Sequence, residues 1–170
     1  MSCIFTTGYS LGCKDNLGGV QEFYIGNFSA DTSFLVGADN IITGGTSVPT
    51  FYTFEQRAEV GSFDQKGNHS IENGTNFWTQ TATLTLYKNQ ASIRDLLLIL
   101  AQSRLQVIIL DQNGKYWMMG EQNATDLTDS SIGSGKEYGS LNGSVFTLTA
   151  KEPSPAKEIS ATYFATLSIV

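Results

Sequence analysis

The sequence predicts a mainly β protein, either a β-sandwich or a small barrel of antiparallel strands, with one flanking α-helix. About seven segments alternate apolar and polar residues at the period of a strand, whereas only residues 92–103 place them at the period of a helix. The chain has 170 residues, of which 41% are hydrophobic, so it can bury the core of one domain. The sequence shows no fixed-period repeat and no domain boundary, and we therefore expect residues 1–170 to form a single domain.

The central part of the chain contains the most regular pattern. Threonine at every second position predicts a strand over residues 77–87 with one polar face. Helical spacing follows in residues 92–103, and Ser92 stands where it would cap the first turn. Leu98 and Ile99 widen the apolar stripe, so we expect both sides of this helix to be covered. The side chains expected to face the core are those of Leu96, Leu97 and Leu100.

An apolar hairpin follows this helix. Residues 105–110 are almost continuously apolar and rich in β-branched side chains, which predicts a buried strand. Asn113-Gly114 supplies a pair able to adopt positive φ, and residues 115–119 run back from that turn. The predicted central unit is therefore a strand, a helix and a hairpin.

Further strands flank this unit. Alternation of apolar and polar residues predicts strands over residues 20–28, 51–60 and 144–150. Residues 51–54 and Phe77-Trp78 are both rich in aromatic side chains. We expect these two segments to pair as antiparallel strands, because cross-strand aromatic contacts would define their register.

Polar stretches and three peripheral segments account for the rest. Residues 61–76 and 121–143 are rich in glycine and polar side chains, and we expect turns and loops there. A compact sandwich does not need an N-terminal arm at about residues 1–19, a loose excursion at about 29–50 with one short hairpin, or a tail at about 156–170. The tail is expected to form a strand or to dock elsewhere.

These three segments mix apolar with small polar residues, and such segments stay disordered unless something covers them. A neighbouring copy can do so through a head-to-tail contact, which closes into a ring when the rotation per subunit divides the circle. Deletion of residues 1–12 or 156–170 is therefore expected to leave a folded body that no longer assembles. The candidate assembly residues are Ile4, Phe5, Leu35, Val36, Ile41, Ile42, Tyr163 and Phe164.

The charge of the chain limits its partners. Ten basic residues stand against 16 acidic ones, for a net charge of −6, which disfavours a nucleic-acid binding site and an anionic membrane surface. The longest apolar run, residues 96–101, is far shorter than the roughly 20 residues of a membrane span. The N-terminus also lacks a basic region followed by an apolar stretch. We expect a soluble protein with no membrane partner.

The sequence offers no reactive constellation. His69 is the only histidine and is expected to be an exposed loop residue, and Gly133-Ser134-Gly135-Lys136 lacks the spacing of a P-loop. Cys3 and Cys13 cannot complete a zinc site with one histidine, and two reduced thiols tucked under the N-terminal segment are favoured over a local disulfide. A solvated loop is favoured over a calcium site for Asp111, Asp126 and Asp129. We expect no catalytic residue, no metal and no cofactor.

Short motifs spread over most of the chain share a likeness with one family. They are Gly8–Asp15, Gly18-Gly19-Val20, Gly61-Ser62-Phe63, Glu72-Asn73-Gly74-Thr75, Ala91-Ser92-Ile93-Arg94, Leu105–Leu110 and Asn113-Gly114-Lys115-Tyr116-Trp117. Together they resemble small virion proteins of tailed phages of gut Bacteroides, including the crAss-like group. The order of strands around a single helix is also similar to the phage tail-tube fold of tube, terminator and ring proteins.

This resemblance implies a non-enzymatic structural protein of the virion tail or neck, made in the cytoplasm of the bacterial host. About six or twelve copies would form a ring that contacts other tail or neck proteins. Double-stranded DNA would pass through its channel without specific binding, since an acidic wall repels phosphates. The alternative is a carbohydrate- or receptor-binding β-sandwich module of a phage appendage, for which a trimer with a groove of aromatic side chains is expected.

Overall fold

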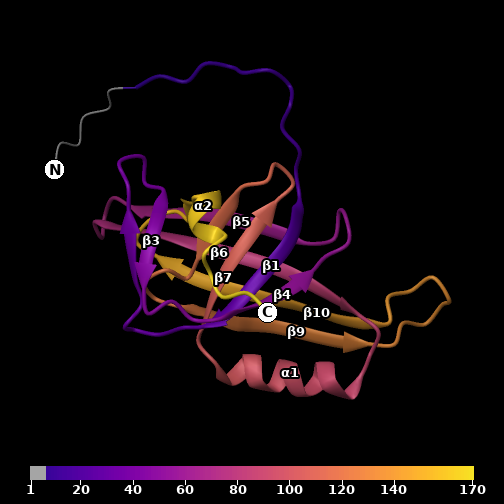
Figure 1. Ribbon diagram of the computed structural model, residues 1–170. Helices are drawn as coiled ribbons and strands as arrows, with labels where there is room; N and C mark the ends of the chain where they lie inside the picture. The colour runs from indigo at the N-terminus through magenta and orange to yellow at the C-terminus, as the bar shows by residue number, and fades with distance from the viewer. Residues whose placement is uncertain (1–6) are drawn as a thin grey trace.

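The computed structural model describes residues 7–170, which form one mixed sheet of 11 strands and two helices (Figure 1). The elements are β1 (Val20–Asn27), β2 (Ser33–Val36), β3 (Ile42–Thr46), β4 (Phe51–Glu55), β5 (Ser62–Ser70), β6 (Thr75–Tyr87), α1 (Ala91–Gln102), β7 (Leu105–Asp111), β8 (Tyr116–Met119), β9 (Thr125–Gly133), β10 (Gly143–Glu152), β11 (Lys157–Ile159) and α2 (Ala161–Phe164). The predicted mainly β class with a flanking helix is confirmed.

The sheet is open, and its strands follow the order β2-β3-β11-β8-β7-β9-β10-β6-β5. In addition, β1 pairs with β7 and with β4. Every pair is antiparallel except that of β3 with β11. Because β9 meets β7 at the single pair Leu105–Thr125, this corner joins two halves of the sheet. One half contains β5, β6, β9 and β10, and the other contains the remaining strands.

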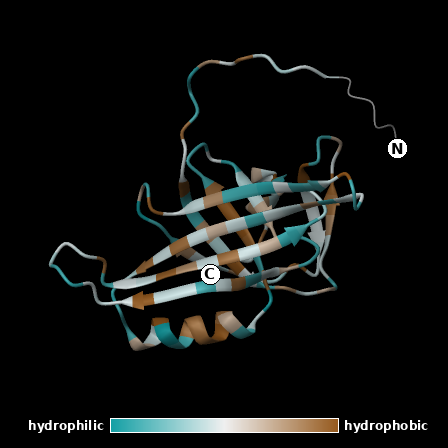
Figure 2. Cartoon of the chain, turned by 180° about the vertical axis from the view of Figure 1, so that it is seen from behind, coloured by the Kyte–Doolittle hydropathy of each residue, from teal (hydrophilic) through white to brown (hydrophobic). Residues whose placement is uncertain are grey.

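The main core lies between these two halves. Ile25 and Val107 come from one half, Leu84 and Phe146 come from the other, and all four belong to one cluster of buried side chains. Hydrophobic and hydrophilic residues alternate along the strands in Figure 2, as expected where one face of a strand is buried. The threonine-rich strand predicted over residues 77–87 follows this rule in β6.

Strand β7 is buried on both faces, which explains its continuous apolar sequence. Val107 and Ile109 face the main core, whereas Ile108 and Leu110 belong to a second cluster on the other side of the strand. The predicted hairpin is confirmed, since β7 pairs with β8 in antiparallel fashion. Gly114 adopts the positive φ of 77° that the turn requires.

Helix α1 closes one end of the main core (Figure 1). Leu97 and Leu100 are buried, as predicted, and Leu96 packs against them. The predicted cap at Ser92 is wrong, because the helix begins one residue earlier and its N-cap, Gln90, makes no side-chain capping bond. The expectation that both sides of the helix are covered is also wrong for the single chain, since Leu98 and Ile99 are each 62% exposed.

The second core lies on the outer face of β1, β7 and β8. It contains Ile42 from the β2–β3 hairpin, Phe51 from β4, and Ile159 and Phe164 from the C-terminal tail. The tail is thus part of the fold, contrary to the expectation of a separable arm. Its last residues also run alongside β4, because the N–H groups of Phe51 and Thr53 donate to the carbonyl groups of Ser168 and Val170 at 2.9 Å. The excursion between β1 and β4 contains the predicted hairpin.

The predicted pairing of residues 51–54 with Phe77-Trp78 is wrong. Strand β4 pairs with β1, and β6 lies between β5 and β10. Gly26 of β1 gives one reason for this choice, since a Cβ there would lie 3.0 Å from Cδ1 of Phe51. The aromatic ring therefore occupies space that only glycine leaves free beside β1.

Two strands lie where loops were expected. Strand β5 occupies most of residues 61–76, and β9 occupies much of residues 121–143. Both are largely polar, so neither shows an apolar alternation, and their neighbours β6 and β10 supply the hydrogen-bonded partners that keep them extended. His69 is consequently an exposed residue of β5 and not of a loop.

Candidate functional site

The predicted assembly residues do not form one exposed surface. Ile42 and Phe164 are buried in the second core, and Val36 and Tyr163 pack against it. The fold brings these four side chains together inside a single chain, and not at a contact between two chains. Leu35 in β2 remains 67% exposed. Four of the six candidates that the structure describes therefore cover the chain's own sheet.

The other three predicted assembly residues are Ile41, Ile4 and Phe5. Ile41 is half-buried and lines a groove beside β11. Ile4 and Phe5 lie outside the described residues, as does Cys3. Cys13 is exposed, so it is not tucked beneath the N-terminal segment as expected.

The described part of the N-terminal segment, residues 7–18, runs away from the body as an extended arm (Figure 1). All of these residues are exposed, and Tyr9 and Leu11 are 89% and 92% exposed. The arm is attached at its inner end, where Asn113 binds the backbone N–H and carbonyl of Leu17, both at 2.9 Å. A long exposed segment with large apolar side chains is typical of a region that another molecule covers.

A second exposed apolar region lies where α1 passes the end of β1 and β4. We call it the helix surface; it consists of Tyr52, Leu98 and Ile99, beside a groove of about 150 Å³ that is lined by Ile25, Gly26, Asn27, Tyr52, Phe54, Leu96, Ile99, Leu100 and Leu105. The brown residues of α1 in Figure 2 show the apolar character of this helix. Exposed apolar side chains grouped beside an apolar groove are typical of an interaction site.

A larger groove lies at the other end of β1, between the β7–β8 hairpin and β5. We call it the Trp117 groove; its volume is about 590 Å³ and its lining includes Asn16, Phe63, Asp64, Gln65, Asp111, Lys115 and Trp117. Trp117 also lines a second groove of about 460 Å³ beside β11. Trp117 therefore borders both grooves.

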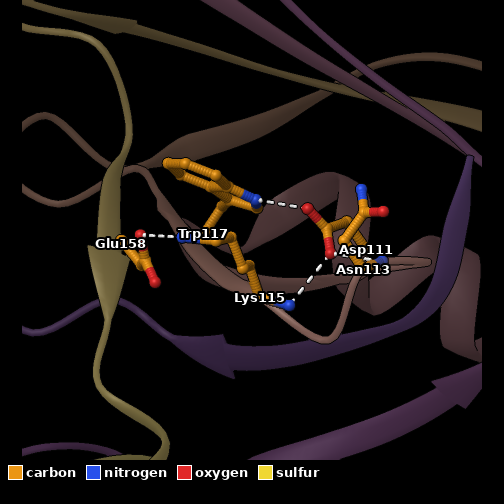
Figure 3. A network of polar contacts seen from close by, with 5 residues as sticks. All are labelled: Asp111, Asn113, Lys115, Trp117 and Glu158. Atoms are coloured by element: carbon orange, nitrogen blue, oxygen red, sulfur yellow. Dashed lines mark hydrogen bonds and ion pairs between the residues drawn. The ribbon is translucent and has the colours of Figure 1, made fainter. Parts of the chain in front are cut away.

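A polar network holds the hairpin beside this groove (Figure 3). Oδ1 of Asp111 accepts hydrogen bonds from the backbone N–H groups of Asn113 and Lys115, both at 2.9 Å. Oδ2 of Asp111 accepts one from Nε1 of Trp117 at 3.1 Å. Lys115 forms an ion pair with Glu158 of β11 at 2.8 Å, although the lysine side chain is half exposed. One carboxylate thus fixes both the turn and the orientation of the indole.

One buried carboxylate lies away from these surfaces. Oε1 of Glu152 accepts hydrogen bonds from the backbone N–H groups of Gln122 at 3.1 Å and of Asn123 at 2.8 Å. Burial raises the pKa of Glu152 above its ordinary value, and these two donors act in the opposite direction. The carboxylate holds the connection between β8 and β9 against the end of β10, which is a structural role.

Sequence reasoning did not identify the helix surface or the Trp117 groove. Each collects residues from segments far apart in the chain, such as Asn16, Asp64 and Trp117. One local signal was available, because Asp111 ends an apolar strand directly before the turn that leads to Trp117. That spacing places both side chains at the same end of a hairpin, but it does not show what faces them.

The described part of the chain shows neither a metal site nor a membrane-spanning helix. Within residues 7–170, no group of three or more His, Cys, Asp and Glu side chains is placed to hold a metal ion. No helix in this part of the chain is long and apolar enough to cross a membrane. Comparison of the chain with protein-family models, curated proteins and solved structures found no match.

Proposed function

We propose that this protein is a non-enzymatic structural subunit that assembles with copies of itself into a ring, in the tail or neck of a tailed phage. The observation that supports assembly best is the helix surface, where Leu98 and Ile99 of α1 are exposed and Ile99 lines a groove together with Tyr52. Exposed aliphatic side chains on a helix gain free energy when a partner removes them from water, by about 25 cal/mol per Å² of apolar area. The extended arm adds Tyr9 and Leu11 to the surface that a neighbour covers.

The positions of these two features favour a head-to-tail contact. The arm joins the body beside Gly19 and Asn113, at the beginning of β1, whereas the helix surface lies at the other end of that strand, near Asn27. A contact between different surfaces of two copies is heterologous, and it produces a closed ring or an open filament. A ring around a DNA channel in the virion is the form that we propose, and the net charge of −6 is compatible with DNA that slides past without binding.

Light scattering and negative-stain electron microscopy of the purified full-length chain test this function. We expect rings of about six or twelve copies. A Leu98→Ser, Ile99→Ser double variant should stay monomeric. The matched control is Ile71→Ser, which removes a fully exposed apolar side chain from the β5–β6 turn. This control should form rings as the wild type does.

Two results would contradict the proposal. A full-length chain that remains monomeric at high concentration would exclude self-assembly. A trimer would favour the alternative, a carbohydrate- or receptor-binding module of a phage appendage. If the double variant assembles as the wild type does, the interface between copies does not include the helix surface.

A further inference from the structure

The Trp117 groove is separate from the helix surface. Val20 lies in the groove at one end of β1, whereas the groove beside α1 is lined by Ile25, Gly26 and Asn27 at the other end. Burial of the helix surface does not itself cover the Trp117 groove, although the root of the arm, at Asn16 and Leu17, lines that groove. A groove of about 590 Å³ is within the range of small-molecule sites.

The indole of Trp117 is fixed before any ligand arrives. Its only polar group donates to Asp111, and Asp111 is itself held by the backbone N–H groups of Asn113 and Lys115. Figure 3 shows the indole between Asp111 on one side and the strand of Glu158 on the other. What Trp117 can offer a ligand is consequently its aromatic surface, beside the two grooves that it lines.

The polar side chains around the indole select the charge of the ligand. Lys115 forms an ion pair with Glu158. Asp64, on the rim of the groove, takes part in neither of the two ion pairs found within residues 7–170. Gln65 accepts the N–H of Ala156 through its carbonyl oxygen at 2.7 Å, which leaves its amide N–H groups available. The groove therefore provides carboxylate and amide groups but no free cation, and it disfavours phosphate, sulfate and nucleic acid.

We propose that the Trp117 groove binds a neutral, linear oligosaccharide. The apolar face of one sugar ring would pack on Trp117, and its hydroxyl groups would donate to Asp64 and accept from Gln65. Trp117 also belongs to the lining of the second groove, with Asn40, Ile41 and Glu158, and further sugar units would extend towards it. Trp117 and Asp64 contact the ligand, whereas Asp111 acts as a positioning residue.

The test uses the full-length chain and saturation-transfer NMR with maltotriose, mannotriose and triacetylchitotriose, and with a trisaccharide of uronic acids as the anionic comparison. We expect saturation transfer to at least one neutral trisaccharide and none to the anionic one. The chain has two tryptophans, so the ligand should shift one of two indole N–H signals in a nitrogen-correlated spectrum.

Variants connect binding to the groove. Trp117→Ala should weaken binding about tenfold or more through loss of the stacking surface. Because Trp117 also packs against the main core, Asp64→Ala is the second variant; this side chain is exposed and should weaken binding without affecting folding. Tyr138→Ala and Glu72→Ala remove an exposed aromatic ring and an exposed carboxylate elsewhere, and should bind as the wild type does.

Three results would overturn the inference: no saturation transfer to any neutral trisaccharide, binding of the anionic trisaccharide alone, or binding that Asp64→Ala and Trp117→Ala both leave unchanged. None of them bears on ring formation, which is measured separately. If the chain forms rings but binds no sugar, the proposed function stands and the proposed sugar site is rejected.

Discussion

The aromatic ring of Phe164 in α2 stacks on that of Tyr116 in β8, with centroids 3.8 Å apart and planes inclined by 19°. Phe164 also contacts the ring of Tyr24 in β1 edge to face, at 5.0 Å. These contacts attach the C-terminal tail to the two central strands of the outer core. The tail is therefore a structural part of the domain, and its removal should unfold the chain.

Replacement of Phe164 by alanine should lower the free energy of unfolding by about 3–5 kcal/mol, because it leaves a cavity between α2 and β8. Urea unfolding followed by circular dichroism measures the change. Val170→Ala is the control, since that side chain is largely exposed, and it should change stability by no more than about 0.5 kcal/mol. A similarly small effect of Phe164→Ala would mean that the tail is a separable arm after all.

Helix α1 offers a comparison between neighbouring leucines. Leu97 is buried in the main core, and Leu97→Ala should cost about 2–5 kcal/mol. Leu98 is exposed, so Leu98→Ala should cost the monomer no more than about 0.5 kcal/mol. The two variants are compared by urea unfolding of dilute protein, where assembly does not contribute. Equal losses for both variants would show that the helix presents a different face to the core.

Glu152 should make stability depend on pH. Because burial raises its pKa in the folded chain, the folded state holds a proton in a pH range where the unfolded state has lost it. The contribution of Glu152 to stability therefore falls as pH rises through this range, and it returns as pH is lowered towards the ordinary glutamate pKa of about 4.3.

A Glu152→Gln variant isolates this effect, since its amide oxygen can still accept from Gln122 or Asn123. The wild type should gain stability relative to the variant as pH falls from neutral to mildly acidic values. Unfolding curves recorded at several pH values measure the difference. Glu72→Gln in the exposed β5–β6 turn should show no such trend. A wild type that loses stability relative to Glu152→Gln on acidification would reverse the sign and exclude this explanation.

The strands that the sequence predicts well have a buried face of their own. In β6 and β10, apolar side chains recur at the period of a strand, β7 is a continuous apolar run, and α1 shows the period of a helix, so each pattern is complete within one segment. Strands β5 and β9 lack that signal because much of their surface faces water, and their extended form depends on hydrogen bonds to β6 and β10. Local pattern cannot indicate a neighbour that lies elsewhere in the chain.

The sequence by itself determined the mainly β class, the central strand, helix and hairpin, and the short β2–β3 hairpin, because the period of apolar residues and the turn at Gly114 are local properties. Only the tertiary structure decided that Phe51 lies against Gly26 and not beside Phe77, and that Phe164 covers Tyr116. It alone placed Asp64 near Trp117 in one groove. These contacts depend on shape complementarity between distant segments, which the composition of either segment does not specify.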